Sequence, residues 1–175
     1  MRDIFRLSEL AGAITRKLRP ASDSFLIKHT VEATFRDCYG NVTSHSITKN
    51  LRTNLGADFW DAQLFKVATA GATANYIAIT TDATAASATD TTLASEETTN
   101  GLARAQAADA HTTSASSSVL SKTFTYTGSV TKTIAKVGLF NASSSGTMVL
   151  ETVLGATGTV NSSGDTLTIQ WSISF

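Results

Sequence analysis

The chain has 175 residues, enough for one packed domain with an extension but short of two full domains. Charged residues make up 16% of it, below the roughly 25% that is typical of soluble domains. So little charge keeps free monomers apart poorly and favours a subunit that is largely covered by neighbours. The single cysteine, Cys38, excludes a disulfide framework and a CxxC zinc site. No run approaches the ~18 apolar residues of a membrane span, so no membrane partner is expected.

The formal net charge is zero, but it is divided unevenly along the chain. Residues 1–52 carry nine Lys/Arg and five Asp/Glu, whereas residues 53–175 carry five and nine. A basic leading segment on an acidic body predicts docking onto an acidic protein surface. A nucleic-acid partner is not expected, because no aromatic or Arg-rich run follows the basic segment.

Residues 2–19 have the spacing of an amphipathic helix, with an apolar stripe on one side and mostly charged residues on the rest. Pro20, the only proline, ends it. The helix could pack on its own domain or reach a neighbouring protein. We predict that residues 1–24 form an assembly arm. The candidate interface consists of four stripe residues and two bases: Ile4, Leu7, Ile14, Leu18, Arg16 and Lys17.

The next segments predict a hairpin followed by a helix. Residues 25–37 alternate between apolar and polar side chains, as a half-buried strand does, and we expect Cys38 to be a half-buried strand residue. Residues 39–41 (YGN) have turn chemistry, and residues 42–49 can return as the partner strand. Residues 53–66 change to a helical period and are predicted to lay aromatic rings on a sheet.

The middle of the chain is richer in Thr, Ala and Ser. Residues 75–81 predict a buried strand, and residues 82–100 predict a surface loop with little to bury. Residues 102–109 are compatible with a short edge strand or a helical turn, and residues 110–118 predict another polar loop.

The last third carries the clearest strand pattern. Four strands are predicted, separated by Gly, Ser and Asn, with a turn over residues 155–164. In the last one, Trp171 lies on the apolar side of a strict alternation. Spacing of this kind predicts a mostly β fold over residues 25–175, an antiparallel β-sandwich of the jelly-roll or Ig-like kind, with an N-terminal helix and one short internal helix. The four strands cover residues 119–127, 132–140, 147–154 and 165–175.

No group of residues has the spacing of a catalytic, cofactor or metal site. The three histidines, at positions 29, 45 and 111, are far apart in the chain. Glu96 and Glu97 are adjacent and are interpreted as solvated charge. Asp82, Asp90 and Asp109 lie in predicted loops, but their spacing matches no EF-hand. We therefore predict no catalytic residues, no cofactor and no metal.

Several short motifs resemble, in order and spacing, those of small tailed-bacteriophage virion proteins of the head-decoration, collar-fibre and tail group. The resemblance covers about residues 50–175. It implies a non-enzymatic virion structural protein, made in the host cytoplasm, whose partners are other virion proteins of the capsid, neck or tail, and which forms a homo-oligomer. The motifs are residues 54–60 (NLGADFW), 75–82 (NYIAITTD), 90–96 (DTTLASE), 101–104 (GLAR), 134–141 (IAKVGLFN) and 165–171 (DTLTIQW).

Within that group, decoration or cementing of the outer capsid surface is the first hypothesis, and a neck, collar or tail subunit is the second. A host-attachment carbohydrate-binding module and an enzyme of unrecognised type are the alternatives from other classes. A carbohydrate module should expose Trp or Tyr on one face. Here Trp171 alternates with core residues and Trp60 stands among apolar neighbours, which argues against it.

Overall fold

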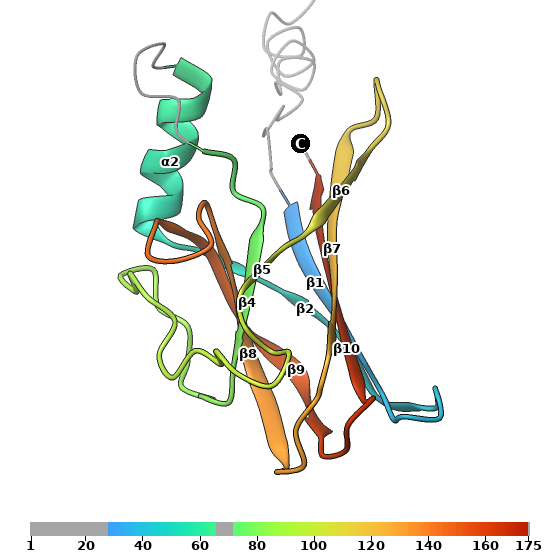
Figure 1. The fold of residues 1–175 in the computed structure, drawn as a ribbon. Coiled ribbons are helices and arrows are strands. Elements are labelled where there is room, and N and C mark those ends of the chain that lie inside the picture. The colour runs from blue at the N-terminus through green and yellow to red at the C-terminus, as the bar shows by residue number, and fades with distance from the viewer. Residues whose placement is uncertain (1–27, 66–71, 175) are drawn as a thin grey trace, which may run out of the picture.

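The computed structural model describes residues 28–65 and 72–174. In these ranges the chain forms two five-stranded antiparallel sheets and one helix, α2 (Asn54–Phe65), which stands at one end of the sheets (Figure 1). The prediction of a mostly β, sandwich-like fold with one internal helix is confirmed. The predicted N-terminal helix at residues 2–19 lies outside the described residues. Within the described ranges, no helix is both long and apolar enough to cross a membrane.

The two sheets are built from strands that are far apart in the sequence. The first sheet has the order β2-β1-β10-β7-β6, and the second has the order β3-β9-β8-β4-β5. The strands of the first sheet are β1 (Lys28–Arg36), β2 (Val42–Lys49), β6 (Ala108–His111), β7 (Ser117–Thr125) and β10 (Thr166–Ser174). Those of the second sheet are β3 (Leu51–Arg52), β4 (Tyr76–Thr80), β5 (Ala105–Gln106), β8 (Lys132–Phe140) and β9 (Met148–Val160).

The apolar residues of β1 and β10 form one wall of the main core. Val31 pairs with Trp171 in the antiparallel register, and both side chains are fully buried. Ala33 and Phe35 continue this buried face along β1. The intervening residues are more exposed, as the side-chain period of two requires. The alternation predicted for both segments is therefore confirmed.

Strand β9 is longer than predicted, because the segment after Gly155 continues as strand to Val160. The glycines there serve close approach rather than a turn. The backbone N–H of Gly155 donates a hydrogen bond to the Thr48 hydroxyl of β2 at 2.6 Å. A Cβ at Gly158 would lie 2.2 Å from the ring of Phe35. The expected turn over residues 155–164 was wrong at its start for this reason.

The middle of the chain links and covers the sheets. Strand β5 belongs to the second sheet and β6 to the first, so the edge strand expected at residues 102–109 crosses between the two. β6 runs to His111 and β7 begins at Ser117, which shortens the loop expected at residues 110–118. The long segment after β4 lies beside the second sheet (Figure 1) and buries Leu93 to 5% exposure, so the expectation that it has little to bury was wrong.

Cys38 lies in the turn between β1 and β2 and is exposed, so the expected half-buried strand position was wrong. The Asp37 side chain organises this turn by accepting hydrogen bonds from the backbone N–H groups of Tyr39 and Asn41. These local bonds end β1 one residue earlier than the sequence pattern suggested.

Candidate functional site

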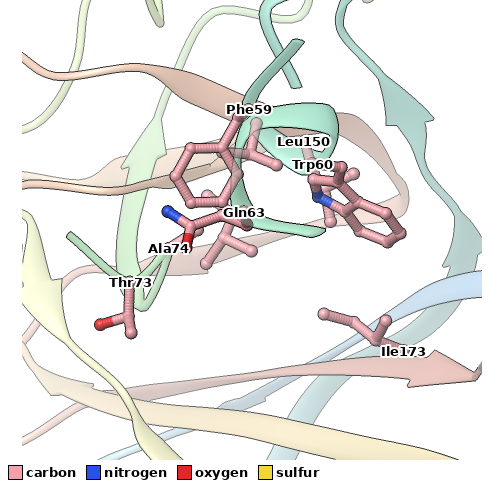
Figure 2. Close-up of a pocket in the computed structure, with 9 residues that line it drawn as sticks. Phe59, Trp60, Gln63, Thr73, Ala74, Leu150 and Ile173 are labelled. Atoms are coloured by element: carbon pink, nitrogen blue, oxygen red, sulfur yellow. The ribbon is translucent and has the colours of Figure 1, made fainter. Parts of the chain in front are cut away.

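A groove of about 240 Å³ opens between α2 and the adjacent ends of the two sheets. Figure 2 shows Phe59 and Trp60 projecting from the helix on one side and Ile173 of β10 on the other. This volume is below the roughly 300–1,000 Å³ of most small-molecule sites. The groove is the candidate functional site because it exposes apolar side chains that are continuous with the core.

Helix α2 is held in place at its first turn by Thr53. The Thr53 hydroxyl accepts a hydrogen bond from the Gly56 N–H at 2.9 Å, which caps the helix, and it donates to the Met148 carbonyl of β9 at 2.5 Å. Because Thr53 is 1% exposed, this cap also joins the helix to the second sheet.

Gly56 allows the helix to pack directly on the backbone of β9. A Cβ at this position would lie 2.0 Å from the Val149 carbonyl oxygen. No larger residue fits without moving the helix, so the cap and this glycine together fix the height of the aromatic rings above the sheet.

The groove has a buried apolar floor and a half-buried apolar rim. Leu139, Val149 and Leu150 form the floor, each at most 1% exposed. The rim residues are partly buried and pack against the main core; they are Phe59, Trp60, Ala74 and Ile173. The polar side chains among the described lining residues are Gln63 and Thr73 (Figure 2). Such a lining suits apolar side chains and provides no charged group for acid–base chemistry.

His29 stands next to the groove at the start of β1. Its ring meets Trp60 edge to face, with centroids 5.2 Å apart and an interplanar angle of 79°. Burial, together with the positive charge of Arg52, holds the pKa of His29 below its ordinary value. Its Nε2 is buried and has no hydrogen-bond partner among the described residues. The imidazole therefore serves here as a neutral aromatic neighbour of Trp60.

A second group of polar side chains lies on the opposite face of the second sheet from the main core. The Nζ of Lys136 lies 3.1 Å from Asp82 Oδ2 and 3.2 Å from Glu151 Oε1, and it donates to the Thr84 hydroxyl at 3.1 Å. Lys136 is 2% exposed and Glu151 is fully buried. No sequence pattern joins these residues, since they come from two strands and a loop.

The pKa values of the three ionisable groups in this cluster are shifted in different directions. Hydrogen bonds from Thr84 and Lys136 hold the pKa of Asp82 below its ordinary value. Burial, reinforced by nearby Asp90, raises the pKa of Glu151 despite its contact with Lys136. The two carboxylates raise the pKa of Lys136 against the opposing effect of its burial. Lys136 therefore has two counter-ions, and through Asp82 the cluster holds the loop after β4 to the sheet.

Glu96 and Glu97 anchor the same loop, so their interpretation as solvated charge was wrong. Glu96 accepts a hydrogen bond from Arg104 Nε at 2.9 Å, and the guanidinium carbon lies 3.5 Å from the ring centroid of Phe140. Glu97 is 7% exposed and accepts from Lys132 at 3.0 Å. The two adjacent carboxylates diverge to different bases and share no substrate position.

Of the three candidate aspartates, Asp82 and Asp90 lie near the Lys136–Glu151 pair, whereas Asp109 does not join them. Among the described residues, no three His, Cys, Asp or Glu side chains are grouped as metal ligands. Asp109 accepts a hydrogen bond from Ser118 in the first sheet, whereas Asp82 lies in the loop after β4 of the second sheet. The predicted interface residues Ile4, Leu7, Ile14, Leu18, Arg16 and Lys17 lie outside the described residues.

The groove was missed at the sequence level, although one signal pointed to it. Phe59 and Trp60 are adjacent in α2, and adjacent helical residues cannot both face one sheet directly. One ring must therefore lie toward the edge of the packing surface, where a groove can form.

No protein-family model matches the chain. A search of curated proteins likewise finds no similar sequence.

Proposed function

We propose that this chain is a non-enzymatic structural protein of a tailed-phage virion that decorates or cements the outer capsid surface. A neck, collar or tail subunit is the second possibility within the same proposal. The observation that carries it is the arrangement of the segments that resemble phage virion proteins: most of them contact one another around the second sheet.

These contacts join motifs that are separated in the sequence. Arg104, from the motif at residues 101–104, bonds to Glu96 at the end of another motif and lies over the ring of Phe140 in a third. Strand β4, in the motif at residues 75–82, pairs with β8, in the motif at residues 134–141. Motifs that contact one another within one sheet stabilise the fold of that sheet. This supports a structural role for these residues and not a catalytic one.

The non-enzymatic part of the proposal is supported by where the charged groups lie. The buried charges on the second sheet are paired with one another beneath a loop. The groove, by contrast, has an apolar floor. A catalytic site needs a nucleophile or an acid–base pair beside a cavity that admits a substrate.

The proposed attachment element is the arm at residues 1–24. An isolated helix of this length is marginally stable in water, so its stripe needs a surface to cover it. Burying Ile4, Leu7, Ile14 and Leu18 would contribute on the order of 6–10 kcal/mol before conformational entropy is subtracted. The bases Arg16 and Lys17 would add salt-sensitive steering toward an acidic neighbour. The low charge of the body suits a homo-oligomer on the particle.

The first part of the test is the copy number of the chain in purified virions, measured by quantitative mass spectrometry. On the order of hundreds of copies indicates the capsid or the tail tube, and about six to twenty indicates the neck or tail tip, because each position repeats with its own symmetry. Absence of the chain from purified particles would refute the proposal.

The second part removes residues 1–20 and measures incorporation into particles. We expect a folded β domain that fails to join them, because the stripe is lost while both sheets remain. Circular dichroism and thermal unfolding provide the folding control. Full incorporation of the truncated chain would show that attachment runs through the β domain, and unfolding would show that the helix belongs to the core.

A further inference from the structure

We propose that the groove beside α2 is the docking site for the apolar stripe of residues 2–19 of the same chain, which covers it until the protein joins a particle. The docking itself does not depend on the phage assignment. Only the release of the stripe from the groove on assembly rests on the proposed function. Three features of the described residues carry the inference: the lining of the groove, the position where the described chain begins, and the charge of α2.

The lining matches the stripe. Phe59, Trp60 and Ile173 form a half-buried rim over a floor of buried apolar side chains. Side chains that are half-buried and continuous with a core gain most from one further apolar layer, because the remaining exposed area is removed from water. The stripe of residues 2–19 has aliphatic side chains at helical spacing and can supply that layer as a helix laid in a groove.

The described chain begins at the groove. Lys28 is the first residue of β1, and its neighbour His29 touches Trp60 and pairs with Ile173 across the sheet. Residues 20–27 connect the stripe to this point, and eight residues span up to about 26–29 Å when extended. The tether is therefore long enough to fold back. A short tether gives an effective concentration on the order of millimolar, which favours the arm of the same chain over that of a second copy.

The charges are complementary. Residues 2–19 carry five bases and two acids, whereas α2 carries Asp58 and Asp61 and no base. Both aspartates are exposed on α2 and lie outside the groove lining, so they attract a basic segment toward the helix over a distance and not by contact within the groove. This match favours the arm over an acidic or neutral partner segment.

Trp60 provides the readout, because Trp171, the other tryptophan, is fully buried and serves as an internal reference. The full-length chain is compared with two variants, Ile14→Asp and Ala13→Asp. These neighbouring positions receive the same charge, but they lie about 100° apart around a helix, so only Ile14 falls on the stripe. Acrylamide quenching and the emission maximum of Trp60 are measured, with Trp60→Phe to identify its share of the signal.

We expect Ile14→Asp to increase quenching and shift the emission to longer wavelength, and Ala13→Asp to leave both unchanged. Equal behaviour of the two variants would overturn the proposal. A second measurement identifies the occupant: in a Cys38→Ser background, Leu7→Cys is combined with Gln63→Cys and oxidised at low protein concentration. An intramolecular disulfide supports docking by the same chain. A disulfide-linked dimer, or no disulfide, contradicts it. Neither measurement uses particles, so failure here is separate from failure of the virion assignment.

Discussion

The two faces of the second sheet are both covered, but by different forces. On the inner face, Ile79, Val137 and Leu139 pack against the first sheet in a dry core. On the outer face, Lys136 of β8 is paired with Glu151 of β9 and with Asp82 from the loop after β4, and a smaller apolar cluster that includes Leu93 and Phe140 lies apart from the main core. The hydrophobic side tolerates small shifts because its attraction has no direction, whereas the ionic side requires specific partners. The comparison indicates that the core contributes most of the stability, and that the ionic cluster and buried Leu93 together position the loop.

The largest expected effect tests the core. Trp171 is fully buried between the sheets, so Trp171→Ala should lower the free energy of unfolding by about 3–5 kcal/mol, measured by chemical denaturation. Thr168→Ala is the matched control on the other face of β10. Thr168 meets Thr123 at 2.8 Å in a cross-strand hydroxyl pair, so the expected loss is below about 1 kcal/mol. Equal losses would show that the faces of this strand are assigned wrongly.

The next effect tests the ionic face. Lys136→Met leaves fully buried Glu151 without its cation, and we expect a loss of about 3 kcal/mol, the lower end for breaking a buried pair. The pKa of Glu151 is already raised, so the carboxyl can take up a proton to relieve its burial. The loss should therefore shrink as the pH falls from 7 to 5.

Two controls sharpen this result. Adding Glu151→Leu to Lys136→Met should recover much of the stability, because the buried charge is removed with its partner. Lys132→Met breaks a pair whose lysine side chain is 31% exposed and whose Glu97 side chain is 9% exposed, so its cost should exceed the roughly 1 kcal/mol of a surface pair but stay below the loss for Lys136→Met. A double variant less stable than Lys136→Met alone would contradict the assignment of Glu151 as the residue left unpaired.

The smallest effect concerns His29 at the groove. Its lowered pKa means that the folded protein binds this proton less readily than the unfolded chain. The stabilisation is fully present above the unfolded value, near pH 6.5, and is lost as the pH falls through the folded pKa. We expect the wild-type protein to lose more stability than His29→Phe between pH 7.5 and 5, with equal pH slopes above pH 7.5. Parallel stability curves over the whole range would show that His29 does not contribute.

The sequence pattern alone predicted those strands and helices in which buried and exposed positions repeat at a fixed period. The alternation through Trp171 predicted the buried face of β10, and the change to a helical period predicted α2 within one residue at each end. These predictions succeeded because one side of each element packs against the main core, through Trp171 in β10 and through Phe59 and Trp60 in α2. By contrast, Gly155 and Gly158 were interpreted as turn residues, since sequence alone does not distinguish a glycine that bends the chain from one that admits a neighbour.

The sequence by itself determined the fold class, the positions of most strands and the buried face of the last one, because side-chain period and burial are linked within a single element. Only the tertiary structure decided how Lys136 meets Asp82 and Glu151, and how α2 and Ile173 enclose a groove. The first arrangement joins two strands of the second sheet and a loop, and the second joins a helix to strands of both sheets. Contacts between separate elements depend on strand order and register, and these are set by the sum of many weak contacts rather than by any local run of residues.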